Sequence, residues 1–332
     1  MTDSRRLRYV ITIAAAVAGL ALFAYSLREA GVPQIVEHVK GIGWGLLLIL
    51  TLAGVRFMLR AEAWRLCTPV GSRLTLRQAF MAFVAGDALG NITPLGLIAS
   101  EPTKVFLTRH HLATRQSVAS LAADNLVYVL SVVAMIALGL GLTLATVPLS
   151  FETREWLIAL LVVLALVCAG VLYVLGMRQP ATNGGSRWLN RLTVVWQSVS
   201  EFSAGHPARL WRAFAFDLLF HAVAILETFL ALGWLLGDRG PSLAEAIMFE
   251  SLNRVITVAF KFVPLRVGVD EVASGAFASL IGLNPAYGVA LALVRKVRNL
   301  FWMGTGLALI GVHHVRETPK LEHQRAVLRT GP

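Results

Sequence analysis

The sequence predicts an all-α integral membrane protein with about six spanning helices and two re-entrant hairpins. Hydrophobic residues make up 56% of its 332 residues and charged residues only 15%, whereas soluble domains carry roughly 25% charged residues. The mean hydropathy is +0.68. Because a spanning helix needs about 20 apolar residues, the whole chain, 1–332, is expected to fold as one polytopic membrane domain. This composition excludes an ordinary soluble protein.

The spanning helices are expected where long apolar runs occur. These runs lie at about 9–26, 43–62, 117–147, 155–176, 210–236 and 286–312. Between them, residues 177–209 form a basic linker, for which we expect an amphipathic helix on the inner leaflet. Residues 313–332 form a basic tail.

Two further apolar segments are interrupted and do not read as single helices. Irregular backbone at membrane depth is tolerated only where it is buried in protein or lines a cavity. A hairpin that enters and leaves on the same side satisfies this rule, so we expect one in each segment. The segments are 78–108, with its break at Asn91, Pro94 and Gly96, and 243–281, with its break at Pro264 and Gly268.

The distribution of basic residues predicts the orientation. The segments expected inside carry 17 Lys and Arg, and those expected outside carry four. Short cytoplasmic loops are enriched in Lys and Arg, so both termini are expected in the cytoplasm. The net charge of +11 is explained as a topology signal, and no nucleic-acid partner is predicted.

The two interrupted segments resemble each other. Pro94 to Glu101 and Pro264 to Glu271 both begin with Pro-Leu and end with Glu, which gives an offset of 170 residues. Further along, Val-Ala pairs align at an offset of 171, which makes Asp124 equivalent to Arg295 and Asn125 equivalent to Lys296. The first repeat covers about 43–147 and the second about 210–312. Since the hairpins are expected on opposite sides, the repeats are inverted, which is typical of transporters whose broken helices meet at the substrate site.

The breaks also carry a resemblance to a known family. They are similar to the membrane region of lysylphosphatidylglycerol synthases and related flippase-like membrane proteins. Pro94, Glu101 and Lys104 match the first family motif, with Ala99 and Ser100 where two glycines are usual. Pro264, Gly268 and Glu271 match the second, with Leu265 and Arg266 at usual glycine positions. The segment 250–306 looks most like members encoded in hopanoid biosynthesis clusters. The resemblance implies lipid transport in the bacterial cytoplasmic (inner) membrane.

Ionisable residues inside the predicted membrane segments are the candidates for function. Each costs about 2.5–3.5 kcal/mol at a helix centre, so each implies a function or a pairing partner. Two readings stay open: internal salt bridges, or a polar cavity whose residues change partners during transport. The candidate substrate-binding residues are Glu101, Lys104, Asp124, Arg254, Lys261, Arg266, Asp270, Glu271, Arg295, Lys296 and Arg298.

Three of these bases are clustered and favour an anion site. Arg295 and Arg298 share one helix face beside Lys296, and arginine can bind phosphate through two hydrogen bonds. Ser100 and Asp270 are expected to cap the helices that leave the breaks, directing two positive helix ends inward. Inverted symmetry could also place Asp124 opposite Arg295, as a buried pair. The bases could equally pair with acids of neighbouring helices.

Two classes of function remain. The first is a transporter that moves a polar-headed lipid, anionic or hopanoid-type, between leaflets. The alternative is a membrane-embedded lipid-modifying transferase or an accessory subunit of a lipid-synthesis complex. The short predicted outer loops favour the transporter. No metal site is predicted, because the adjacent pairs His110-His111 and His313-His314 lack the spacing of a helical metal site. No cofactor or catalytic residue is predicted, because no phosphate loop, dinucleotide motif or nucleophile elbow occurs. The partners expected are membrane lipids.

Overall fold

A computed structural model describes residues 41–93, 97–176 and 197–329. Long helices account for most of these residues, and no strand occurs among them. Residues 197–205 are also helical. The other helices are α3 (Gly45–Cys67), α4 (Leu76–Ile92), α5 (Leu97–Thr108), α6 (Thr114–Thr146), α7 (Phe151–Gly176), α9 (Pro207–Leu236), the 3₁₀ turn η1 (Gly237–Arg239), α10 (Leu243–Ala259), the 3₁₀ turn η2 (Pro264–Arg266), α11 (Val269–Leu280) and α12 (Pro285–Arg329).

Within the described residues, the helices follow the apolar runs closely, except that α12 continues beyond the predicted span 286–312 to Arg329, through most of the predicted basic tail. Both interrupted segments form two helices each, α4 with α5 and α10 with α11. The predicted span at 9–26, the first break at Pro94 and Gly96, and most of the 177–209 linker lie outside the described residues.

Three described helices are long and apolar enough to cross a membrane, namely α6, α7 and α9. α3 has 23 residues but contains Arg56, Arg60, Glu62 and Arg65, which make it less apolar. Arg56 and Arg60 are buried, so α3 turns these two charges toward protein. The structure therefore presents a multi-pass membrane protein whose less apolar helices keep charged side chains inside the bundle.

The two helices that precede the breaks begin with the same capping arrangement. In α4, the backbone N–H of Gln78 donates to Thr75 Oγ1 at 3.3 Å, and the Thr75 N–H donates to Gln78 Oε1 at 2.9 Å. In α10, Ser242 and Glu245 exchange the same two bonds at 3.1 and 2.8 Å. Such reciprocal bonds satisfy backbone donors that the first turn leaves free. They fix where each helix starts.

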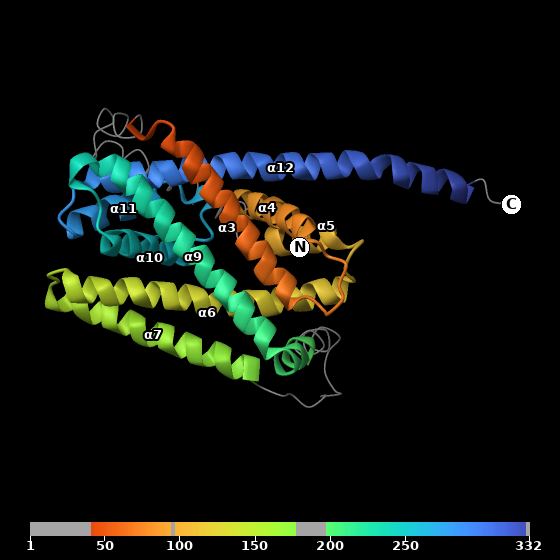
Figure 1. Cartoon of the computed structure of the whole chain (residues 1–332), viewed down its shortest axis with the longest axis horizontal. Coiled ribbons are helices and arrows are strands. Elements are labelled where there is room, and N and C mark those ends of the chain that lie inside the picture. Colours follow the sequence, from red (N-terminus) through yellow and green to blue (C-terminus); the bar gives the residue numbers. More distant parts are fainter. Residues whose placement is uncertain (1–40, 94–96, 177–196, 330–332) are drawn as a thin grey trace, which may run out of the picture.

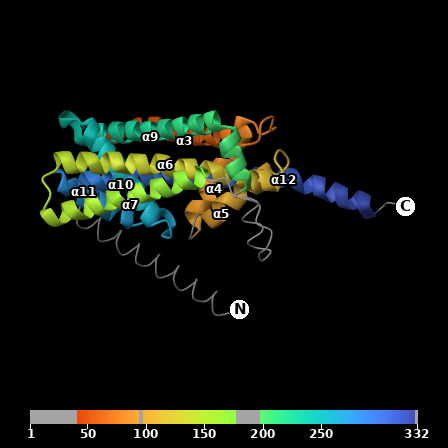
Figure 2. The same ribbon diagram turned by 90° about the horizontal axis from the view of Figure 1, so that it is seen from below.

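Among the described helices, the extensive contacts between separate helices include α3 along α9, α11 against α12, α4 against α12 and α6 against α10. Figures 1 and 2 show the α4–α5 pair in one half of the molecule and the α10–α11 pair in the other half. α7 packs on α6.

Glycines permit two of these contacts. A Cβ atom on Gly139 of α6 would collide with Ser251 of α10, and one on Gly306 of α12 would collide with the Val84 backbone of α4. Small residues of this kind let membrane helices approach closely.

Candidate functional site

Buried arginines and carboxylates fill the centre of the bundle. Glu227 on α9 accepts hydrogen bonds from Arg56 of α3, at 2.9 Å, and from Arg298 of α12. All three side chains are buried. One carboxylate thus joins three helices, and removing it would leave two guanidinium groups without their partner.

A second carboxylate performs the same task nearby. Glu250 on α10 accepts hydrogen bonds from Arg254 on the same helix and from Arg295 of α12, the latter at 3.2 Å. Arg295 also donates to Thr228 Oγ1 of α9 at 2.9 Å. The predicted anion-binding residues Arg295 and Arg298 are therefore both engaged with acids of neighbouring helices.

These two arrangements form one electrostatic unit, the core arginine cluster, in which arginines outnumber acids. Arg56 interacts with Glu250 and Arg254 as well as with Glu227 and Arg298. Its Nε is buried and has no hydrogen-bond partner among the described residues. The cluster has a formal charge of +2, since its members are Arg56, Arg254, Arg295, Arg298, Glu227 and Glu250.

A third buried group has the opposite balance. Arg60 of α3 donates to Asp124 Oδ2 of α6 at 2.8 Å and to Asp217 of α9. Its guanidinium lies 4.0 Å from the centre of the Tyr128 ring, and the Tyr128 hydroxyl accepts a bond from Arg254 at 3.4 Å. Tyr128 thereby connects this group to the core arginine cluster.

The expected pairing of Asp124 with Arg295 is wrong. The two residues have partners on different helices. Asp124 accepts a hydrogen bond from Arg60 on α3, and Arg295 donates one to Thr228 on α9. The physical reason is that α6 packs against α3 and α12 packs against α9, so each side chain meets a partner there.

Near the breaks, a further set of charges gathers, which we call the inter-break site. Lys104 on α5 donates to Glu101 Oε1 at 2.8 Å, and Arg266 donates to Asp270 at 3.0 Å. On α4, the Asn91 amide donates to Asp87 at 2.8 Å. Asp87 interacts electrostatically with Lys104 and Arg266, and η2 contacts α4. The site consists of Asp87, Asn91, Glu101, Lys104, Lys261, Arg266 and Asp270.

Lys261 differs from the other bases of the inter-break site. Its side chain is exposed and forms no hydrogen bond or ion pair with any described residue. The charges that act on it are Lys104, Glu101, Asp87 and Arg266, which come from both interrupted segments. Lys261 is therefore a cation without a partner of its own among the described residues, within electrostatic range of both segments.

The second break contains strained backbone. Leu265 and Arg266 have positive φ angles of 52° and 47°, a conformation that costs an L-residue roughly 1–2 kcal/mol. Gly268, at φ 83°, adopts a similar region without that cost. Leu265 and Arg266 thus stand at the positions where the family motif has glycine, and both have the positive φ angles that glycine adopts readily.

Removing this strain should stabilise the protein. We expect Leu265→Gly to raise the free energy of unfolding by about 1 kcal/mol, and Gly268→Ala to lower it, since a Cβ is unfavourable at φ 83°. Thermal unfolding of the purified variants in detergent measures both. If Leu265→Gly destabilises as much as Gly268→Ala does, the break is not strained.

The expected capping residues are also wrong. Gly268 is the N-cap of α11, with Asp270 in the first turn, and Ser100 lies within α5. The Gly268 N–H donates to Glu271 Oε2 at 2.8 Å. The side chain of Glu271 thus satisfies the backbone N–H of the N-cap residue. Glu271 also accepts a bond from Lys296 of α12.

Five further charged residues of the buried clusters lie in predicted membrane segments but are not among the predicted site residues: Arg56, Arg60, Asp217, Glu227 and Glu250. Their common signal is a charge within an apolar run. Arg56 and Arg60 are also four residues apart, which places them on one face of a helix. This spacing indicates that α3 directs two arginines into the interior of the bundle, where both form buried ion pairs.

The family comparison agrees with this picture of a membrane bundle with charged breaks. Residues 10–308 match the family described as the lysylphosphatidylglycerol synthase transmembrane region. No curated protein and no solved structure matches the chain. Since the match covers most of the chain, the protein belongs to the family of lysylphosphatidylglycerol synthase transmembrane regions.

Proposed function

We propose that the protein is a flippase that moves a polar-headed lipid, anionic or hopanoid-type, between the leaflets of the bacterial inner membrane. The observation that carries this proposal is the inter-break site, where Lys261 lies among charges from both interrupted segments. A polar headgroup crossing the membrane needs such a place, because charged and polar groups are otherwise costly there. The hopanoid option rests on the sequence resemblance of residues 250–306.

An inverted repeat would provide the moving parts. The capping boxes that begin α4 and α10 are 167 residues apart, and both helices have 17 residues. The contact of Gly139 with Ser251 and the contact of Gly306 with Val84 are also related by 167 residues. The broken pairs lie in opposite halves of the molecule (Figures 1 and 2). These regularities support two halves that rock against each other around a common site.

The core arginine cluster supports an anionic headgroup. Its formal charge of +2 is unfavourable in a membrane interior unless an anion approaches. Arginine forms strong, charge-assisted bonds to phosphate. We assign the cluster the role of attracting a phosphate-bearing headgroup toward the centre of the bundle when the halves separate.

The orientation can be tested at the two ends of one helix. Gln116, near the start of α6, and Ser150, just after its end, are both exposed. They are separated by about 50 Å, at 1.5 Å per residue. In a background lacking Cys67 and Cys168, we expect Gln116→Cys to react with an impermeant maleimide from the cytoplasm and Ser150→Cys from outside. Reaction of both from one side would refute the orientation.

Lys261 provides the functional test. Because Lys261 is exposed and unpaired among the described residues, Lys261→Gln should fold normally. It should slow leaflet-to-leaflet lipid movement about tenfold or more, since a charge-assisted bond contributes about 1.5–3 kcal/mol. Lys261→Arg, which keeps the charge, should retain most of the rate.

The readout is the movement of a fluorescent phospholipid in proteoliposomes, with thermal unfolding as the control for folding. An unchanged rate in Lys261→Gln would remove the inter-break site from the transport route. Loss of activity in both variants with normal stability would show that the shape of lysine matters, rather than its charge.

A further inference from the structure

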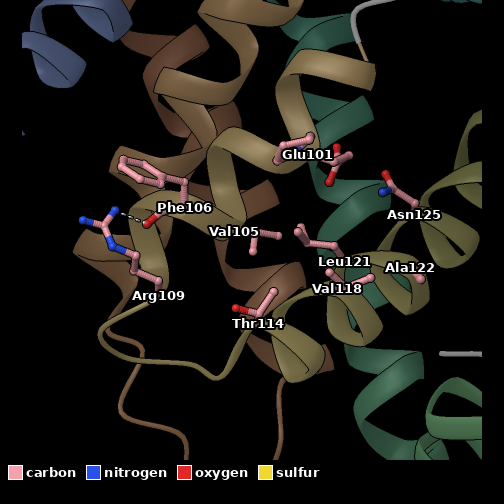
Figure 3. A pocket seen from close by; sticks show the side chains of 10 residues that line it. Glu101, Val105, Phe106, Arg109, Thr114, Val118, Leu121, Ala122 and Asn125 are labelled. Carbon is pink, nitrogen blue, oxygen red and sulfur yellow. Dashed lines mark hydrogen bonds between the residues drawn. The ribbon is translucent and has the colours of Figure 1, made fainter. Parts of the chain in front are cut away.

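A groove of about 630 Å³ lies between α5 and α6, outside the core arginine cluster. Its walls are mostly apolar, with Val105, Leu121 and Ala122 among the lining residues, and its polar lining residues are Glu101, Asn125, Arg109 and Thr114. Figure 3 shows Glu101 and Asn125 toward one end of the groove and Thr114 and Arg109 toward the other. An amphipathic molecule matches this division.

The polar end has unused hydrogen-bonding capacity. Glu101 Oε1 accepts from Lys104 at 2.8 Å, but Glu101 Oε2 is buried and has no partner among the described residues. The Asn125 amide forms no side-chain hydrogen bond with any described residue either. A buried acceptor without a donor costs about 1–3 kcal/mol, so a donor brought by a ligand would be favourable here.

The second half of the chain shows how the equivalent position is filled. Under the proposed repeat, Glu271 corresponds to Glu101 and Lys296 to Asn125. In the second half, the Lys296 ammonium of α12 donates to Glu271 on α11, and both oxygens of Glu271 are bonded. In the first half, α6 offers an amide in place of the ammonium, and one oxygen of Glu101 stays free.

We propose that the α5–α6 groove binds a lipid whose polar group donates a hydrogen bond to Glu101 Oε2. This donor takes the place that the Lys296 ammonium has beside Glu271 in the second half of the chain. The apolar wall formed by Val105, Leu121 and Ala122 contacts the hydrocarbon of the lipid. An ammonium and a hydroxyl group both supply the required donor. This inference rests on the proposed function, since it names the chemistry of a lipid that the transporter recognises.

Binding is tested without measuring transport. Ala122→Cys, in a background in which Cys67 and Cys168 are serine, places a thiol on the groove wall. The protein is reconstituted in nanodiscs of phosphatidylcholine alone, or with added phosphatidylethanolamine or phosphatidylglycerol. The choline headgroup has no N–H or O–H donor, the ethanolamine headgroup brings an ammonium and the glycerol headgroup brings hydroxyls. The rate of alkylation of the thiol by N-ethylmaleimide is measured.

We expect a donor-bearing lipid to slow alkylation on the order of threefold relative to phosphatidylcholine alone, because the bound fraction is protected. Protection by phosphatidylethanolamine alone identifies an ammonium, and protection by both lipids identifies donors in general. Equal rates in all three membranes would overturn the proposal. Because this readout is binding, a protein that moves no lipid can still show protection, and the failure of one proposal leaves the other testable.

Two variants at one position make the test specific. Asn125→Lys should supply the missing ammonium from α6, as Lys296 does from α12, and should abolish the dependence on headgroup while preserving thermal stability. Asn125→Leu leaves the Lys104–Glu101 pair intact and should weaken the protection. Glu155→Gln, an exposed glutamate on α7, is the matched control and should behave as the parent. Persistent headgroup dependence in Asn125→Lys would refute the placement of the donor on Glu101.

Discussion

Glu250→Gln is expected to lower the free energy of unfolding by about 3–5 kcal/mol, because it leaves two buried guanidinium groups without their carboxylate. Glu250 is 1% exposed and accepts bonds from both Arg254 and Arg295. Amide oxygens accept a hydrogen bond but cannot balance the charge. Thermal unfolding in detergent, calibrated by chemical denaturation, measures the loss.

The matched control for this change is Glu155→Gln. Glu155 is an exposed glutamate on α7, so its replacement should alter stability by less than about 0.5 kcal/mol. If the two variants unfold at the same temperature, Glu250 does not hold the core arginine cluster together, and the arginines must find their stabilisation elsewhere.

The second large effect is expected at Arg60. Arg60→Gln leaves Asp124 and Asp217 facing each other without the cation between them and should cost about 3–5 kcal/mol. Adding Asp124→Asn should recover part of the loss, with a coupling energy of about 1–3 kcal/mol. By contrast, Asp124→Asn combined with Arg295→Gln should give losses in the free energy of unfolding that are additive to within about 0.5 kcal/mol, because Asp124 and Arg295 have different partners.

A double-mutant cycle on purified protein distinguishes the two arrangements. Coupling between Asp124 and Arg295, and none between Asp124 and Arg60, would mean that the helices pack differently from the structure. The converse result would establish that α3 is the helix to which Asp124 is anchored.

Much of the helix layout could be predicted because local patterns determine it. Apolar runs bounded by loop residues gave α6, α9 and both interrupted segments within a few residues. Proline and glycine in apolar context located the second break at Pro264 to Gly268, and the structure has its turn there. The signal for each of these elements lies within a short stretch of chain.

The partners of the charged residues could not be predicted in the same way. A repeat offset aligned Asp124 with Arg295, but only the packing of α6 on α3 and of α12 on α9 decides what each side chain meets. The cap at Gly268 was missed because a positive φ angle, rather than a side-chain oxygen, starts α11. The free oxygen of Glu101 depends on how α6 packs beside α5, because α6 presents Asn125 there in place of a lysine, and no local sequence pattern determines that packing.

The division of labour among these charges explains why the chain can carry so many of them. Arg60 and Glu227 form ion pairs with residues on other helices, and these pairs offset the cost of burying the charges. Lys261 and Glu101 Oε2 retain capacity for a ligand. Variants of Lys261 and Glu101 should therefore affect recognition with little effect on stability, whereas variants of the buried pairs should lower stability.

The central claim is that the protein alone moves lipid between leaflets. The direct measurement follows a headgroup-labelled anionic phospholipid in proteoliposomes of the purified protein, with quencher added outside and no donor substrate present. We predict that the quenchable fraction rises beyond that of protein-free vesicles and that the recovered lipid has an unchanged mass. A quenchable fraction equal to that of protein-free vesicles, or a lipid recovered with an added chemical group, would contradict the account.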